Sequence, residues 1–206
     1  MAEQHNLFDA DTLRGPDGLR VLRDRALCCQ KCPLHKTRTQ VVFGVGNSQN
    51  PPIMFVGEAP GKNEDEKGVP FIGRAGELLD KMILAMGYSR DQIYIANSVN
   101  CRPPDNRKPE QLELEACREH LVGQARHVRP KIIVALGASA AQSLLKSKKT
   151  IGELRGRWYE WEKIPVRATF HPAYLLRDSS KKVQAWEDLQ VVKQRLEAEA
   201  LYTQST

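Results

Sequence analysis

Residues 131–136 (Lys-Ile-Ile-Val-Ala-Leu) form the clearest strand signal in this chain. Every residue after the lysine is apolar, without the alternation expected of a strand that has one face in water. Such a strand is typical of a parallel sheet that is covered by helices on both faces. Gly137-Ala138-Ser139 follow it, and a helical pattern then runs to Leu145. This unit therefore predicts an α/β fold.

Strand and helix patterns alternate along the rest of the chain, which favours the same architecture. Apolar residues at helical spacing predict a helix over 75–86, which Gly87 ends, and Pro109 is expected to open another. The other expected strands are 53–56, 92–96, 158–161 and 165–170, and the other expected helices are 17–27 and 183–196. We therefore expect a three-layer α/β/α fold with a central four-stranded parallel sheet.

The composition is that of an ordinary globular protein, because 41% of the 206 residues are hydrophobic and 27% are charged. We expect a single domain over residues 16–200, between a flexible N-terminal tail (1–15) and a C-terminal tail (201–206). No apolar run is long enough to span a membrane and no signal peptide is recognised, so the expected location is the cytoplasm. The net charge of +6 permits a polyanionic partner.

Distinctive residues follow each expected strand. Residues 57–61 (Gly-Glu-Ala-Pro-Gly) follow the first, Asn97 the second, residues 137–139 the third and His171 the last. In open α/β sheets the ligand crevice lies beyond the carboxyl ends of the strands, so these segments are expected to form one site. Glycine and proline punctuate any loop, and an ordinary strand-to-helix turn is the alternative interpretation of residues 57–61.

The cysteines are unevenly placed, with Cys28, Cys29 and Cys32 near the start and Cys101 and Cys117 far along the chain. Cys29-x-x-Cys32 is a chelating spacing, and Cys101 and Cys117 could complete a site of four thiolates for zinc or an iron–sulfur cluster. Cys28 offers a second register with Cys32. The alternative is a set of buried, inert thiols. A metal here would have a structural role.

Together these motifs resemble the family 4 uracil-DNA glycosylases, which carry an iron–sulfur cluster. The resemblance extends from Cys29 through Asp188. Its motifs are residues 57–61 with Glu64-Asp65, 70–76 (Pro-Phe-Ile-Gly-Arg-Ala-Gly), 94–97 (Tyr-Ile-Ala-Asn), 101–107, 156–159 and 171–177 (His-Pro-Ala-Tyr-Leu-Leu-Arg). It implies a monomeric glycosylase that excises uracil from single- or double-stranded DNA. The implied cofactor is a 4Fe-4S cluster on Cys29, Cys32, Cys101 and Cys117.

The resemblance also implies the residues that grip the base. Phe71 would stack on a flipped uracil, and the amide of Asn97 would match uracil O4 and N3–H, whereas cytosine presents the opposite pattern. His171 would donate a hydrogen bond to uracil O2 as negative charge accumulates there. Gly57 and Ala59 would line the substrate site.

Three polar residues are assigned by resemblance to the chemistry around the sugar and the base edge. Glu58 would face the sugar, orient the attacking water and stabilise the cationic sugar. Glu64 would wall off C5 of the base and so exclude the methyl group of thymine. Asn106 matches a position implicated in catalysis.

The last motif is expected to contact DNA. Leu175, together with Leu176, would wedge into the space that the flipped nucleotide leaves, and Arg177, Lys181 and Lys182 would meet phosphates. The alternative is that the two lysines simply lie at the solvent-exposed start of a helix.

Two departures bear on this resemblance. Ala173 replaces a serine that often contacts phosphate in related glycosylases. The Lys-Arg-Arg-Ile-His insertion of the related cross-linking proteins is absent after the Cys101 segment, which favours turnover over suicide capture.

Residues 4–8 (Gln-His-Asn-Leu-Phe) resemble the Gln-x-x-Leu-Phe peptide by which bacterial repair proteins bind the DNA sliding clamp. The clamp is therefore a possible partner through Gln4 to Phe8. Two other functions stay open: a non-catalytic iron–sulfur DNA-binding module, and a nucleotide-binding enzyme that uses the 57–61 turn. The missing G-x-G-x-x-G and P-loop lysine count against the second.

Overall fold

The computed structural model describes residues 15–204, with side chains described as far as Leu201. The predicted clamp peptide at Gln4 to Phe8 lies outside these residues and stays a prediction. Six strands form one sheet in the order β1-β3-β2-β4-β6-β5. The strands are β1 (Val45–Gly46), β2 (Ile53–Gly57), β3 (Tyr94–Asn97), β4 (Ile132–Leu136), β5 (Trp158–Trp161) and β6 (Ile164–Thr169).

The predicted parallel sheet forms the centre of this larger sheet. β3, β2, β4 and β6 are parallel neighbours, while β1 and β5 pair antiparallel at the two edges. The sheet is therefore mixed, with six strands, although its four central strands are the parallel ones that the apolar runs predicted. The short β1 escaped prediction because Val45-Gly46 carries no strand pattern.

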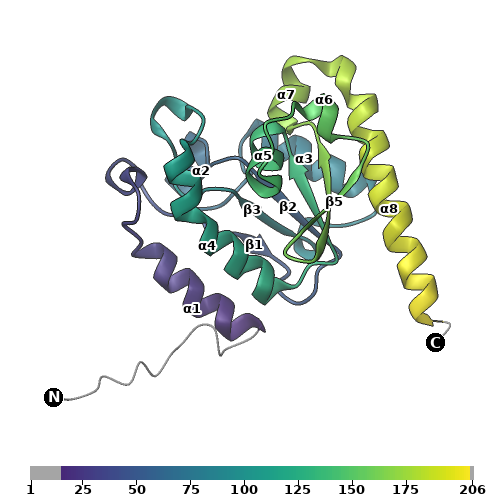
Figure 1. Cartoon of the computed structure of the whole chain (residues 1–206), viewed down its shortest axis with the longest axis horizontal. Helices are drawn as coiled ribbons and strands as arrows, with labels where there is room; N and C mark the ends of the chain where they lie inside the picture. The colour runs from purple at the N-terminus through teal and green to yellow at the C-terminus, as the bar shows by residue number, and fades with distance from the viewer. Residues whose placement is uncertain (1–14, 205–206) are drawn as a thin grey trace.

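Helices cover both faces of the sheet (Figure 1). They are α1 (Gly15–Leu27), α2 (Lys62–Lys67), α3 (Arg74–Ala85), α4 (Gln111–Val128), α5 (Ala138–Leu145), α6 (Ile151–Leu154), α7 (Pro172–Arg177) and α8 (Lys182–Gln204). Short 3-10 turns connect them at Pro33–Lys36, Arg90–Gln92, Pro104–Asn106 and Ser179–Lys181. No helix among the described residues has the length and apolar character that crossing a membrane requires.

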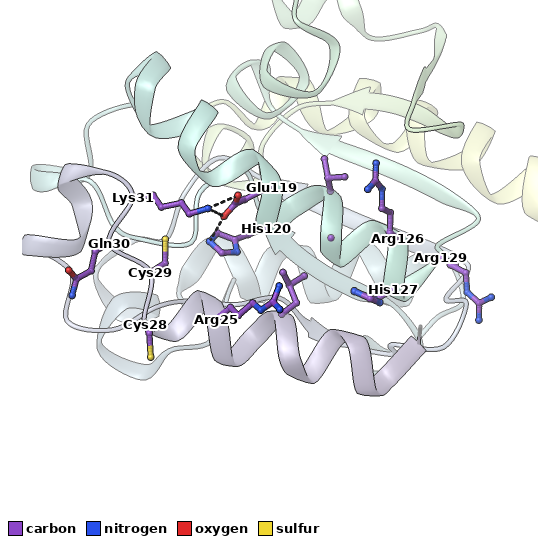
Figure 2. A pocket seen from close by; sticks show the side chains of 13 residues that line it. Arg25, Cys28, Cys29, Gln30, Lys31, Glu119, His120, Arg126, His127 and Arg129 are labelled. Carbon is purple, nitrogen blue, oxygen red and sulfur yellow. Dashed lines mark hydrogen bonds and ion pairs between the residues drawn. The ribbon is translucent and has the colours of Figure 1, made fainter. Parts of the chain in front are cut away.

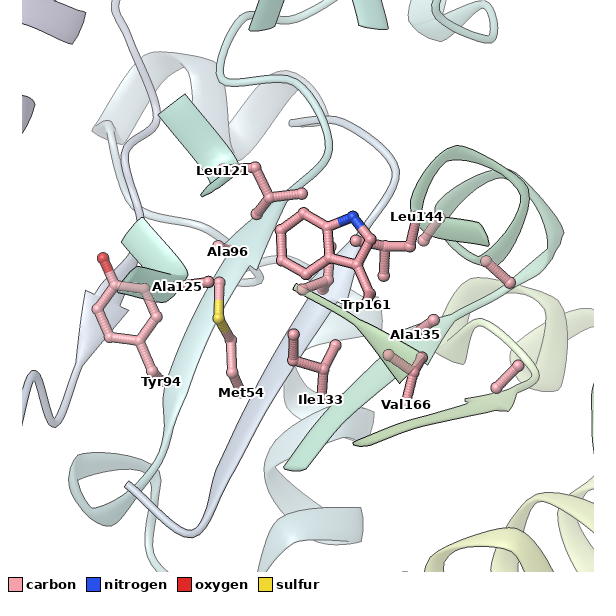
Figure 3. Packing of buried hydrophobic residues seen from close by; sticks show 14 of the residues in the cluster. Met54, Tyr94, Ala96, Leu121, Ala125, Ile133, Ala135, Leu144, Trp161 and Val166 are labelled. Carbon is pink, nitrogen blue, oxygen red and sulfur yellow. The ribbon is translucent and has the colours of Figure 1, made fainter. Parts of the chain in front are cut away.

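The buried strands divide their side chains between two cores, because successive residues of a strand point to opposite faces. On β2, Met54 and Val56 pack with α4 and α5, whereas Ile53 and Phe55 pack with α3 and α8. Figure 3 shows the first of these cores, with Trp161 of β5 closing it over Ile133. The parallel strands are thereby held in fixed register, and so are the segments that follow their carboxyl ends.

The sequence-predicted helices are present with shifted ends. α4 begins at Gln111 rather than Pro109, because Glu110 caps it: the backbone N–H of Glu110 donates to Oε2 of Glu113 at 2.7 Å. α8 continues to Gln204, past the predicted boundary at residue 200. α2 and α7 were not among the predicted helices, since each has only six residues, too few for an apolar periodicity to show.

Candidate active site and cysteine site

Four strand-end segments meet at the carboxyl edge of the sheet. Gly57 and Asn97 are paired residues at the ends of β2 and β3. After β4, the backbone N–H of Gly137 donates to the carbonyl of Thr169 at the end of β6, at 2.8 Å. Gly137 in turn approaches His171 so closely that a Cβ on Gly137 would lie 2.9 Å from the Cβ of His171. The predicted convergence of these segments is therefore present.

Gly57 is the point where two predicted base-binding side chains meet. A Cβ on Gly57 would lie 2.4 Å from Oδ1 of Asn97 and 2.6 Å from Cζ of Phe71. Only a hydrogen atom fits between them. The ring of Phe71 also lies 5.6 Å, centroid to centroid, from the imidazole of His171. We call Gly57, Phe71, Asn97 and His171 the strand-end cluster.

The loop that carries Phe71 is held in an unusual shape. Phe71 has a φ of +53°, which is strained for a bulky residue. A Cβ on Gly76 would lie 1.9 Å from the carbonyl oxygen of Phe71, so this bend requires glycine at position 76. Glu64 closes the loop, because its Oε1 accepts hydrogen bonds from the backbone N–H groups of Ile72 and Gly73, each at 3.0 Å.

Asn97 is buried, with 2% of its surface exposed, and its Oδ1 has no hydrogen-bond partner among the described residues. An unpaired buried acceptor costs about 1–3 kcal/mol. Its persistence at the end of a central strand is typical of a side chain that awaits a ligand with a donor.

The protonation of His171 follows from its surroundings. Burial and the nearby charge of Arg177 lower the pKa of His171 to about 4, although the charge of Glu64 opposes the shift. The imidazole is therefore neutral at physiological pH. Its Nδ1 accepts a hydrogen bond from the backbone N–H of Ala173 at 3.1 Å, so the ring proton resides on Nε2. The side chain thus offers a neutral donor.

Glu58 and Ala59 begin the turn that follows β2, and both are half-buried. The carbonyl of Glu58 accepts a hydrogen bond from the N–H of Val99 at 3.2 Å, and Ala59 packs against the core that contains Cys101. Asn106 ends the exposed 3-10 turn Pro104–Asn106, where its Oδ1 accepts a hydrogen bond from Nε of Arg102 at 2.8 Å. Among the described residues, no hydrogen bond joins Asn106 to the strand-end cluster.

The structure corrects the predicted wedge. Leu175 is only 2% exposed and packs with Phe170 and Ala185, so its side chain is not available to DNA in this structure. Leu176 is 42% exposed, and Tyr174 beside it is 36% exposed. Arg177 is also exposed, with its guanidinium 6.0 Å from the ring of Tyr174.

The cysteines that the sequence predicts as ligands line one small cavity. Cys29, Cys32, Cys101 and Cys117 contribute to its wall, and Cys28 does not. The structure thereby favours the Cys29-x-x-Cys32 register. Among the described residues, no three His, Cys, Asp or Glu side chains stand in a ready-made metal-binding arrangement. The four thiols therefore share a cavity without converging on a single point.

Two groups that the sequence analysis missed donate to the sulfur atoms. Nη1 of Arg38 lies 3.2 Å from Sγ of Cys101, and the backbone N–H of Asn100 lies 3.3 Å from Sγ of Cys117. Burial raises the pKa of the Cys117 thiol to about 12. These donors suit thiolates that a bound positive centre keeps deprotonated. Arg38 gave no signal in the sequence because its partner is distant along the chain.

A family model described as the Uracil DNA glycosylase superfamily matches residues 43–190. This match spans more than half of the chain and includes the whole strand-end cluster. The chain belongs to the uracil DNA glycosylase superfamily.

The relatives identify the branch. The type-4 uracil-DNA glycosylase of Saccharolobus solfataricus is 42% identical over 194 residues, which cover 90% of this chain and 89% of the relative. That of Archaeoglobus fulgidus is 46% identical, over 73% of this chain and 79% of the relative. The type-4 uracil-DNA glycosylase of Thermotoga maritima is 42% identical, over 88% of this chain and 96% of the relative. The resemblance to family 4 in the sequence is thereby confirmed.

Proposed function

We propose that this protein flips uracil out of DNA and hydrolyses its N-glycosidic bond, which leaves an abasic site. The observation that carries the proposal is the buried Oδ1 of Asn97, which has no partner among the described residues and lies near Phe71, whose ring in turn lies beside the neutral donor of His171. An acceptor, a donor and an aromatic ring are the groups that recognise a flipped pyrimidine.

Base selection rests on the direction of the hydrogen bonds. Oδ1 of Asn97 accepts from uracil N3–H, and the amide NH₂ donates to O4. Cytosine places an acceptor at N3 and a donor at C4, so it leaves the buried amide unpaired on both sides. Glu64 excludes the C5 methyl group of thymine, and Phe71 stacks on the face of the base.

Bond cleavage places positive charge on the sugar and negative charge on the departing base. The electron pair of the C1′–N1 bond moves into uracil, where Nε2–H of His171 stabilises the charge that develops at O2. On the sugar side, the carboxylate of Glu58 stabilises the oxocarbenium-like carbon and orients the water that adds to C1′. Asn106 and the DNA contacts of Arg177 and Leu176 complete the proposed set.

The four cysteines are proposed to hold a 4Fe-4S cluster, which supplies a structural cross-link when bound. A shared cavity, an all-sulfur donor set and two hydrogen-bond donors aimed at sulfur support this fit. The cross-link joins the segment after α1 to the loop after β3 and to α4. Ala59 packs on this same core, so the cysteines hold the turn that carries Glu58.

The test compares single-turnover excision from oligonucleotides that carry uracil, thymine or cytosine at one position, with alkali revealing abasic sites. We expect cleavage only at uracil. Asn97→Ala should lower the rate by about 10²–10³-fold, as loss of one transition-state donor does. If Asn97→Ala excises uracil at the wild-type rate, the assignment of Asn97 to the base-binding site is wrong. Binding of duplex DNA without any abasic product would instead support a non-catalytic module.

A further inference from the structure

The α4–α5 groove is a hollow of about 910 Å³ between the N-terminal half of α4 and the length of α5. Gly137, which abuts His171, is the residue that precedes α5, and Ser139 on the first turn of α5 lines the groove. One end of the groove, at Ser139, therefore begins two residues along the chain from Gly137, although no residue of the strand-end cluster lines the groove itself.

The groove is lined by lysines that have no ion-pair partners in the described part of the chain. Lys108, Lys146 and Lys148 line the groove, and none of the three forms an ion pair with any described residue. Glu115 is the carboxylate in the lining, and its Oε1 accepts a hydrogen bond from Gln111 at 2.8 Å. Arg118 of the lining pairs with Glu162 at 3.5 Å. Three free ammonium groups on the rim attract a polyanion.

Serine hydroxyl groups also line this groove. Ser139 and Ser143 lie four residues apart on α5, so they occupy the same face of the helix, and Ser147 continues the row just beyond its end. Serine hydroxyls and lysines are among the groups that contact DNA phosphates without reading sequence. The groove offers both kinds along its length.

A second groove of similar size has the same formal charge, but its cations are paired differently. It lies between α1 and α4, has a volume of about 960 Å³, and is seen in Figure 2. Lys31 and His120 point toward Glu119, and Lys31 pairs with its carboxylate; Arg126 pairs with Glu162 at 3.4 Å. This groove reaches Arg129, which precedes β4 and so lies toward the opposite edge of the sheet.

We infer that the α4–α5 groove binds the phosphate backbone of the uracil-bearing strand on one side of the target nucleotide. This inference rests on the proposed function, because it extends the path of the DNA away from the strand-end cluster. A strand that leaves the cluster past Ser139 meets Ser143 next, and then Lys146 and Lys148. Lys108 faces it from the α4 side.

The test measures DNA binding as a function of salt for Lys146→Gln/Lys148→Gln. Three single-stranded uracil oligonucleotides are compared: a minimal one, one extended only 5′ and one extended only 3′. With one of the two extended strands, we expect about tenfold weaker binding and a log–log salt slope that is smaller by about 1.4, which is two phosphate contacts. The minimal strand should bind both proteins equally. Lys108→Gln should weaken the binding of the same extended strand.

Arg126→Gln/Arg129→Gln, in the α1–α4 groove, removes the same charge and serves as the matched control. An equal loss in this control, or an equal loss with both extended strands, would show a general charge effect and overturn the inference. Excision of the minimal strand by the wild type tests the proposed function separately. If that strand is not cleaved, the proposed function fails while the binding comparison still reports on the groove.

Discussion

The strand-end cluster presents a buried polar atom without a partner, whereas sulfur atoms of the cysteine site already receive hydrogen bonds. Among the described residues, Oδ1 of Asn97 has no hydrogen-bond partner, while Cys101 is contacted by Arg38 and Cys117 by the N–H of Asn100. The two regions are only three residues apart between Asn97 and Asn100. The unpaired acceptor of Asn97 lies where the base is proposed to bind, whereas the sulfur atoms already receive hydrogen bonds from the protein. The cysteine cavity has unpaired polar atoms of its own, because Nδ2 of Asn100 and both ring nitrogens of His120 form no hydrogen bond with the described residues.

The comparison is most strongly tested at the cysteines. Cys29→Ala should lower the free energy of unfolding by more than about 4 kcal/mol, as loss of a metal site does, and so lower Tm by roughly 8–16 °C. Iron and sulfide content should fall with it. Cys28→Ala, next to it but outside the cavity wall, should leave Tm and iron content unchanged. Equal effects of the two variants would contradict the assigned register.

The cluster should respond in the opposite way, with activity lost before stability. In Gly57→Ala the new methyl group meets Asn97 and Phe71, so both side chains must move. Displacement of this kind should reduce single-turnover excision by about 100-fold. Gly152→Ala is the control, because its nearest neighbour outside the helix would be Oγ1 of Thr150 at 3.8 Å. Full activity in Gly57→Ala would show that these contacts do not position the base.

Two neighbouring leucines of α7 should show the same contrast, one affecting stability and the other affecting DNA binding. Leu175→Ala should cost about 2–5 kcal/mol of stability, because the side chain is buried. Leu176→Ala should leave Tm unchanged and weaken binding to duplex DNA that contains uracil by about tenfold, or 1.4 kcal/mol. Thermal melts and fluorescence anisotropy give the two quantities. If Leu175→Ala stays folded and binds this DNA more weakly, while Leu176→Ala binds it as the wild type does, then Leu175 and not Leu176 is the wedge.

The smallest effect concerns pH. With a pKa of about 4 for His171, lowering the pH from 7.5 to 5.5 should leave the imidazole neutral and alter its contribution to excision by less than about twofold. A pKa near 6.5 would instead remove about nine-tenths of the neutral form. An NMR titration of the His171 ring, assigned with His171→Gln, measures this directly.

The same shift affects stability with a defined sign. In the unfolded chain His171 has a pKa near 6.5, so that state binds the proton first as the pH falls. The stability that neutral His171 contributes is complete above pH 6.5 and is lost as the pH falls toward 4. His171→Gln should flatten this part of the stability profile.

The central strands could be predicted from the sequence because their apolar runs are continuous and both faces are buried. The order of strand ends also predicted that Gly57, Asn97, Gly137 and His171 would lie at one edge of the sheet, as they do, whereas Phe71 follows no strand and was suggested only by the family resemblance. The choice between Leu175 and Leu176 could not be predicted, since α7 is too short for a periodic pattern and packing against Phe170 decides which leucine is buried. The tautomer of His171 depends on the N–H of Ala173, a backbone group that every non-proline residue has.

The left-handed backbone at Phe71 has a consequence for directed evolution toward bulkier damaged bases. The position of the Phe71 ring, which is proposed to stack on the base, depends on a backbone φ of +53° and on the bare Cα of Gly76. A library that varies Phe71 alone can shrink or remove the ring, but it cannot shift the ring to make room. Widened substrate range should therefore come from libraries that rebuild the whole segment from Glu64 to Gly76.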